Sequence, residues 1–372
     1  MSAPTTPDPS GDRPHVGLRL HTLTPITPRW LARRVLPLVD ELTQRHGAVH
    51  VRLQQGWLHG PHVELTAYRG RRGPLPWQQI ADGWDAGPAD AERALTKRAY
   101  LDQARALGRM ERVAPPYLPL REHGTAWPLT DGERTAPWPG VLGELREYAL
   151  ARLLGPVRRT VASLADAPQE ALERAAEAFV AVAEAHPYGA AYGAFSFRSH
   201  AEAFFNSTAE SSGSQSARAQ SPRAAFAHRL EGDRTRLEAV VRLALEGGET
   251  PTASAWRGAI AYCAGLFESA AVRGDVDAAD LAELAGPHDD GGRAPSPFHQ
   301  AVAAADAVDG GAAWFTGYRT VINLFYRQLP LLGVSPLQRF YLCHAIAECI
   351  DGVLGETWQQ RLERRASPAS TV

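Results

Sequence analysis

Lysine is nearly absent from this chain of 372 residues, in which Lys97 stands alone beside thirty-eight arginines. A mechanism through a lysine Schiff base would have to use Lys97. That residue lies next to Arg98 in a polar, helix-like stretch, where its ammonium group is expected to face water. We therefore exclude covalent catalysis through lysine.

Cysteines and long apolar segments are also scarce. The three cysteines, Cys263, Cys343 and Cys349, lie in apolar helix-like sequence, so we expect core positions and no disulfide framework. No apolar run reaches the roughly 20 residues that span a bilayer, and residues 1–13 lack the apolar centre of a signal peptide. These features predict a cytoplasmic protein that does not enter a membrane.

An excess of one charge and the familiar catalytic motifs are missing as well. Forty-one acidic and thirty-nine basic residues leave a formal net charge of −2, which gives no global attraction to nucleic acid or to an anionic bilayer. The chain has no G-x-x-x-x-G-K-[ST] loop, no G-x-G-x-x-G turn after a strand, no H-E-x-x-H and no G-x-S-x-G. Nucleotide-binding, zinc-protease and serine-hydrolase functions therefore lack support.

The first part of the chain alternates strand-like and helix-like patterns. Residues 1–14 are rich in proline and have no apolar period, so we expect disorder there. Alternating apolar residues predict strands at 15–20, 48–53 and 61–68, and a one-sided apolar stripe predicts a helix over 28–45. The last two strands are expected to pair antiparallel in an α/β sheet layer.

The rest of the chain is expected to be mostly helical. A helix at 89–107 precedes an irregular, proline-rich stretch at 114–120. Beyond Pro139, the predicted helices are 141–158, 168–185, 199–211, 222–247, 253–272, 276–285, 297–308, 312–329 and 336–354. The fold class is therefore α+β. We expect one catalytic domain over 15–372, made of an α/β part at 15–140 and a larger helical part at 141–372.

Two groups of residues could be mistaken for metal sites. His59, His62 and Glu64 include imidazole and carboxylate ligands of the kind that zinc prefers. On a strand, however, only His62 and Glu64 share a face, because His59 precedes them in a turn. Cys343 and Cys349 fit the apolar face of a helix. We predict no metal site.

Polar residues crowd between aromatic ones in residues 191–205. Ser199 and Glu202 have the spacing of a capping box at a helix start, which gives both a structural role. The same explanation leaves Arg198 and His200 without a purpose, although a buried polar side chain requires partners.

Two further polar places stand out. In the first, Ser296 caps a helix whose first residue is proline, which explains everything there except His299. In the second, Tyr318 begins a stretch in which helical spacing gathers a polar, partly cationic stripe. The members of that stripe are Arg319, Asn323, Tyr326 and Arg327.

The order of these short motifs resembles a known family. The motifs are VHVRL at 49–53, PHVEL at 61–65, FRSHAEAF at 197–204, INLFYR at 322–327 and LGVSPLQR at 332–339. Together they resemble the glutamate-elimination domain of lantibiotic dehydratases and, more closely, its stand-alone descendants in thiopeptide antibiotic pathways. The resemblance covers the chain from about His15 onward and implies the same α+β fold.

One position departs from the elimination domains. Their two strands carry arginines that serve the glutamyl leaving group, and Arg52 matches the first of these. The second position holds Glu64, a charge reversal that would repel a departing glutamate. The resemblance then points to the pyridine synthase, which joins two dehydroalanines of an azole-bearing precursor peptide in a formal aza-[4+2] cycloaddition, with loss of water and of the leader peptide.

Such a reaction needs no cofactor, because both reacting alkenes lie in the substrate and the enzyme must bring them together and move protons. The partner implied is a ribosomally made precursor peptide with its leader and its dehydrated, azole-containing core. Neutral histidine, tyrosine and serine side chains are suited to this proton traffic, and arginines to gripping carbonyl groups. The candidate catalytic residues are Ser199, His200, Ser296, His299, Tyr318 and Tyr326, and the candidate substrate-binding residues are Arg52, Glu64, Arg198, Asn323 and Arg327.

Two alternatives stay open. A stand-alone elimination enzyme would convert glutamylated serine or threonine into dehydroamino acids and leave the peptide linear. A non-catalytic module would bind the leader and leave it chemically unchanged. We expect the leader to bind the α/β part, through an exposed strand edge and the arginine-rich residues 69–72.

Overall fold

The computed structural model describes residues 15–69, 74–89, 94–111, 113–130, 138, 140–208, 221–276, 294–305 and 311–366. The chain divides into two compact units, of which one ends at Pro137 and the other begins at Trp138. The expected disorder of residues 1–14, nearly all of the helix expected at 276–285 and most of the arginine-rich stretch at 69–72 lie outside the described residues.

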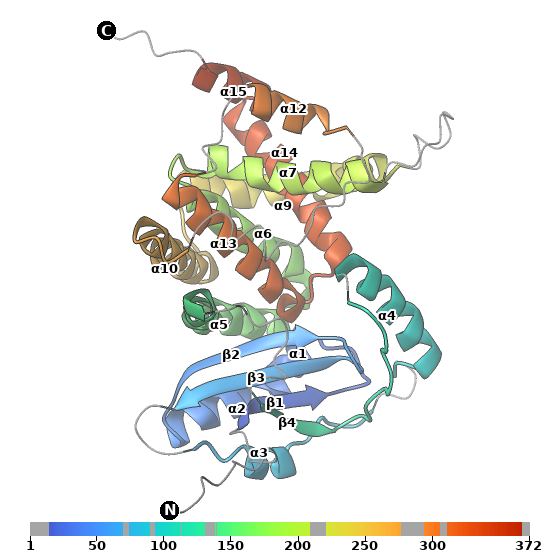
Figure 1. Cartoon of the computed structure of the whole chain (residues 1–372). Helices are drawn as coiled ribbons and strands as arrows, with labels where there is room; N and C mark the ends of the chain where they lie inside the picture. The colour runs from blue at the N-terminus through green and yellow to red at the C-terminus, as the bar shows by residue number, and fades with distance from the viewer. Residues whose placement is uncertain are drawn as a thin grey trace, which may run out of the picture. The chain divides into compact units, whose positions relative to one another are not determined.

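The first unit contains an antiparallel four-stranded sheet (Figure 1). Its strands are β1 (His15–His21), β2 (Ala48–Gly56), β3 (His62–Arg69) and β4 (Ala126–Thr130), in the order β2-β3-β1-β4. Three of these strands and the antiparallel pairing of β2 with β3 confirm the sequence prediction. The strand β4 escaped prediction because it is short and contains Pro128, which weakens the strand signal.

The two faces of the sheet differ in chemistry. Successive side chains of a strand point to opposite faces, so alternate positions of β1 and β3 place Leu18, Leu20 and Leu65 on a buried apolar face. The register places Glu64 opposite Arg19 on the other face. That second face therefore carries charged groups at the centre of the sheet.

The helices of the first unit are short apart from α4. They are α1 (Pro28–Arg34), α2 (Leu36–Asp40), the π-helical turn η1 (Glu41–Arg45), α3 (Trp77–Gly83) and α4 (Lys97–Glu111). The helix expected over 28–45 is interrupted at Val35, and Pro37 stands in the first turn of the next helix, where its missing N–H costs nothing. The helix expected from residue 89 begins at Lys97, because Thr96 accepts a hydrogen bond from Ala99 N as its cap.

The second unit is helical in its described part. Its helices are α5 (Gly140–Asp166), α6 (Ala171–Glu184), α7 (Ala190–Thr208), α9 (Pro222–Leu245), α10 (Pro251–Val272), α12 (Pro297–Ala304), α13 (Ala313–Gln328), α14 (Pro336–Leu354) and α15 (Trp358–Ala366), with 3₁₀ turns η3 (Pro168–Glu170) and η4 (Leu329–Leu332). A Ser-Pro or Thr-Pro pair starts several of them, and in each case the hydroxyl accepts a backbone N–H while proline takes the first helical position.

The core of the second unit forms around aromatic rings. Phe179 of α6 is fully buried and touches Phe197 of α7 and Phe325 of α13, with ring centroids 5.1 Å apart in both pairs. Trp256 of α10 donates its indole N–H to Thr160 of α5 at 3.0 Å. Among these helices, α10 packs against α5, α6 and α13, whereas α14 packs against α7 and α9 (Figure 1).

The helix α7 corrects one expectation. It starts at Ala190, directly after Gly189 in a left-handed conformation (φ 73°), so Ser199 lies in its middle and the expected capping box of Ser199 and Glu202 is wrong. The apolar face of α7 continues back from Phe197 to Ala190 at helical spacing, which explains the longer helix. The α+β fold class is confirmed. No helix in the described part of the chain has the length and hydropathy needed to cross a membrane.

Candidate active site

A histidine of α12 joins two serines in one chain of hydrogen bonds. His299 Nε2 lies 2.9 Å from Ser199 Oγ of α7, and His299 Nδ1 lies 2.8 Å from Ser296 Oγ. Ser296 is also the cap of α12, and its hydroxyl oxygen accepts the backbone N–H of His299 at 3.4 Å. The structure thus brings together three of the predicted residues, although Ser199 and His299 are 100 positions apart in the chain.

The neighbouring residue on α7 belongs to a second hydrogen-bonded group. His200 Nδ1 lies 2.7 Å from the carbonyl oxygen of Ser196, and the hydroxyl of Tyr326 lies 3.2 Å from the same nitrogen. The Tyr326 hydroxyl is also 3.2 Å from Cys343 Sγ of α14. The two rings of His200 and Tyr326 meet edge to face, with centroids 5.1 Å apart.

The tautomer of His200 follows from these partners. A carbonyl oxygen can only accept, so Nδ1 must carry the proton that it shares with Ser196. The neutral ring then has its lone pair on Nε2. Within the described residues no hydrogen bond to Nε2 is formed, so the protein engages this ring through Nδ1.

The surroundings keep both histidines neutral. Burial lowers the pKa of His200 to about 4, and the guanidinium groups of Arg339 and Arg319 act in the same direction. Burial also lowers the pKa of His299, against a smaller opposing effect of Glu202. At neutral pH each ring therefore accepts a proton on one nitrogen and donates from the other.

The remaining groups near His200 are protonated. Burial raises the pKa of Tyr326 well above its ordinary value and that of Cys343 to about 12. Tyr318 is fully buried, which raises its pKa as well, and its hydroxyl donates to the carbonyl oxygen of Gly193 at 3.4 Å. These hydroxyl and thiol groups can donate hydrogen bonds but are not anionic nucleophiles.

The expected polar stripe on α13 divides into two faces. Arg319 and Asn323 are exposed and Arg327 is half-buried, at a spacing of four residues. Tyr326, which was expected in this stripe, is instead buried against His200. The difference arises because α13 is covered on that side, so a ring at position 326 packs inward.

Arg198 has carboxylate partners inside the second unit. It is buried on α7 and donates to Glu348 at 2.6 Å and to Asp351 at 2.8 Å, both on α14. Asp351 also pairs with the buried Arg361 of α15. Substrate binding by Arg198 stays a prediction, but the ion pairs give this side chain a structural purpose that its sequence context did not supply.

Arg52 and Glu64 lie in the first unit, on neighbouring strands. Arg52 is buried, donates from Nε to Thr66 at 2.6 Å and lies over the ring of Tyr68. Glu64 accepts two hydrogen bonds from Arg19, at 2.7 and 3.0 Å. This ion pair neutralises the carboxylate, so the repulsion of a departing glutamate that Glu64 was expected to cause is offset by Arg19.

The possible metal ligands that the sequence offered have other contacts in the first unit. The parts of the chain that the structure describes hold no group of three or more histidine, cysteine, aspartate or glutamate residues placed to bind a metal ion. His62 instead uses Nδ1 to donate to the carbonyl oxygen of Gly60 at 2.8 Å. Burial lowers its pKa to about 3.

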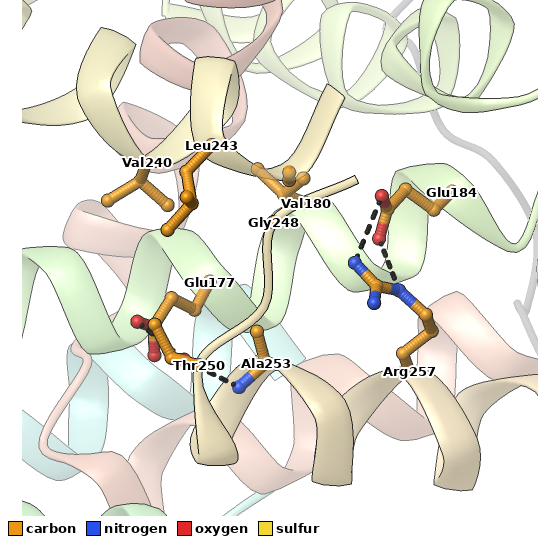
Figure 2. Close-up of a pocket in the computed structure, with 10 residues that line it drawn as sticks. Glu177, Val180, Glu184, Val240, Leu243, Gly248, Thr250, Ala253 and Arg257 are labelled. Carbon is orange, nitrogen blue, oxygen red and sulfur yellow. Dashed lines mark hydrogen bonds and ion pairs between the residues drawn. The ribbon is translucent and has the colours of Figure 1, made fainter. Parts of the chain in front are cut away.

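A small cavity lies elsewhere in the second unit, between α6, α9 and α10 (Figure 2). Its volume of about 30 Å³ has room for about two water molecules. Its charged lining residues are Glu177 and the ion pair of Glu184 with Arg257. Because it contains none of the predicted site residues and cannot hold a peptide, we assign it no role in the site.

Three residues of the site were missed in the sequence. Ser196 stands four residues before His200, a spacing that places it on the same helical face and could have identified it. Cys343 was interpreted as a core residue, and it is fully buried, but it also contacts Tyr326. Arg339 lies 5.1 Å over the ring of Tyr326, a contact between two helices that no local pattern reveals.

The fold is shared with proteins of known structure. The chain is similar to the pyridine synthase TbtD from thiomuracin biosynthesis, with a TM-score of 0.61 and 21% identity over 92% of this chain and 99% of that one. It is also similar to TsrL, with a TM-score of 0.57 and 17% identity over 95% of this chain and 99% of that one. No protein-family model matches the sequence, and no curated protein matches it. The resemblance to a pyridine synthase is thus confirmed at the level of the fold.

Proposed function

We propose that this protein is a thiopeptide macrocyclase, which forms a pyridine or dehydropiperidine ring from two dehydroalanines of a modified precursor peptide. The observation that carries the proposal is the pair of neutral histidines, His200 and His299, each hydrogen-bonded to hydroxyl groups on a fold shared with TbtD. In the proposed reaction, water and the leader peptide are lost as the ring becomes aromatic.

The reaction makes modest chemical demands. Both alkenes belong to the substrate, so binding one peptide in a folded shape replaces the encounter of two molecules and lowers the entropic part of the barrier. The remaining work is proton transfer to and from an amide and two leaving groups. Neutral imidazoles and un-ionised hydroxyls perform such transfers near pH 7 without a cofactor.

The two units are given different tasks in this proposal, within one catalytic domain. The second unit supplies the proton-transferring residues. In the strand order of the first unit, β2 and β4 are the outermost strands, and an outermost strand is where an extended leader peptide could add to a sheet. We propose a cytoplasmic enzyme whose partner is the precursor peptide, with no nucleic acid and no membrane involved.

The test is incubation with a dehydrated, azole-containing precursor peptide that retains its leader, followed by mass spectrometry. The proposal requires a macrocycle and a released leader that ends in a carboxamide. An intact linear peptide after long incubation with folded protein would contradict it.

Glutamate elimination is the second candidate, and the ion pair of Arg19 with Glu64 favours keeping it. With Glu64 neutralised, Arg52 on the same sheet is not opposed by a free carboxylate. The same assay separates the candidates, because elimination converts a glutamylated precursor into a linear, dehydrated peptide that keeps its leader. A leader-binding module would leave both substrates unchanged.

A further inference from the structure

His200 lies on α7 and His299 contacts the same helix from α12, but the two rings differ in which nitrogens are engaged. His200 uses Nδ1 alone, toward the carbonyl oxygen of Ser196 and the hydroxyl of Tyr326. His299 uses both nitrogens, and both of its partners are serine hydroxyls. The two rings therefore cannot move protons in the same way.

The arrangement at His200 suits a base. Its Nδ1 proton is held by a carbonyl oxygen at 2.7 Å, so the lone pair on Nε2 has a fixed direction. The same Nδ1–H is also directed at the Tyr326 oxygen, and the Tyr326 hydroxyl in turn donates to Cys343 Sγ. This hydroxyl therefore also holds the ring in place. Burial and the nearby guanidinium groups of Arg339 and Arg319 disfavour the protonated ring, so a proton taken up at Nε2 is readily passed on.

The arrangement at His299 suits a proton carrier. Ser296 Oγ accepts a backbone N–H, and as a hydroxyl it can also donate its own proton to His299 Nδ1, the direction that we assign here. The opposite nitrogen, Nε2, then carries a proton and donates it to Ser199 Oγ. The chain ends at the half-buried Ser199, whose hydroxyl proton is left for a third group.

We infer that His200 removes the amide proton through Nε2, whereas the chain Ser296–His299–Ser199 delivers protons to the departing oxygen and nitrogen. This assignment rests on the proposed function and divides its proton transfers between two sets of residues. It makes opposite tautomers the distinguishing feature of the two rings, Nδ1–H in His200 and Nε2–H in His299.

The steps balance without a further reactant. In the first, the amide nitrogen loses its proton to His200 Nε2, and His200 returns that proton to the amide oxygen, which gives the 2-azadiene. Two carbon–carbon bonds then close the ring. In each later elimination a ring C–H proton is lost, one C–O or C–N bond breaks, and the departing atom takes the Ser199 proton. His299 then donates a proton to Ser199, and the proton lost from the ring carbon returns to His299.

The first arm of the test uses the leader-bearing precursor with His200→Gln and His299→Gln. The peptide should remain linear with His200→Gln. With His299→Gln it should cyclise but keep its leader, with a mass equal to that of the substrate or lower by one water. Ser199→Ala should stop at the same stage as His299→Gln, which covers the case in which the histidine variant fails to fold. His228→Gln, at an exposed site on α9, is the matched control and should act like the wild type.

The second arm needs no turnover. Long-range ¹H–¹⁵N spectra of protein labelled in histidine distinguish the two tautomers, and the Gln variants assign the signals. We expect Nδ1–H for His200 and Nε2–H for His299. Identical tautomers, or a linear peptide with His299→Gln alongside an active wild type, would overturn the inference. A wild type that leaves the peptide linear would instead refute the proposed function and with it these roles.

Discussion

Replacement of Tyr326 by phenylalanine removes one hydroxyl that joins His200 to Cys343. The hydroxyl lies 3.2 Å from both partners, and one of the two is a thiol, which is a weak hydrogen-bonding group. His200 Nδ1 keeps its shorter bond to Ser196, so no strongly polar atom is left unpaired. We therefore expect a loss of only about 1 kcal/mol in the free energy of unfolding. In a helical unit of this size, that loss lowers the thermal midpoint by about 2–4 °C.

The effect on turnover should be much larger. If Tyr326 holds the ring of His200 in the orientation that meets the substrate, its loss should reduce the rate of macrocycle formation by roughly 10²-fold, the usual scale for disturbing a general acid–base group. The assay is single-turnover conversion of the leader-bearing precursor, followed by mass spectrometry. It should be run well below the thermal midpoint, so that the folded fraction is the same for both proteins.

The matched control is Tyr341→Phe on the same helix as Cys343. The Tyr341 hydroxyl donates to Asp233 at 2.7 Å, and because its partner is charged, losing it should cost about 1.5–3 kcal/mol. This variant should therefore be the less stable of the two and yet retain full turnover. Refutation would come from equal turnover in the two variants, which would reduce Tyr326 to a packing residue.

Three further outcomes follow from the described contacts. Arg198→Met should lower the free energy of unfolding by about 3 kcal/mol in urea titrations, near the lower limit for a broken buried ion pair, because Asp351 keeps Arg361 as a partner. Burial lowers the pKa of His21 and His62 to about 3, so between pH 6.5 and 3 only the unfolded chain takes up these protons. The sheet should thus lose stability as the pH falls through that window, which is measured as faster amide hydrogen exchange in β1 and β3 after correction for the intrinsic pH dependence of exchange. Corrected exchange rates that do not change with pH would contradict this. Thiol reagents should leave turnover unchanged, since burial raises the pKa of Cys343 to about 12. Chelators should also leave turnover unchanged, and a loss of turnover with a chelator that added zinc restores would disprove this expectation.

The sequence predicted most of the regular elements because their signals are local. Alternating apolar residues identified β1, β2 and β3, and Ser335-Pro336 marked the start of α14 at the residue where the helix begins. Errors arose where a local signal had a different cause. Ser199 and Glu202 have the spacing of a capping box, but the packing of α7 extends that helix nine residues earlier, to Ala190.

The candidate site was only partly predictable for a related reason. Residue type and position singled out His200 and His299, since neither had a structural purpose in its own segment. Their partners come from other helices, and the bond of Ser199 to His299 spans 100 positions that no spacing rule connects. Arg339 and Cys343 carried no polar signal of their own in the sequence, because each acts through its contact with Tyr326.

The choice between cyclisation and elimination turns on charge in the first unit. Taken alone, Glu64 places a negative charge where elimination domains hold an arginine, and this favoured the cyclase. The ion pair with Arg19 removes most of that difference, since a neutral pair neither attracts nor repels a glutamate at a distance. Compared with an arginine at position 64, the ion pair of Glu64 with Arg19 lacks the net positive charge that could bind the leaving glutamate. Within this sheet, Arg52 could still bind the departing glutamate, because its hydrogen bond to Thr66 uses Nε alone. One guanidinium would then do the work that two share in an elimination domain, so the charge pattern of the sheet suits a departing glutamate less well but does not forbid it.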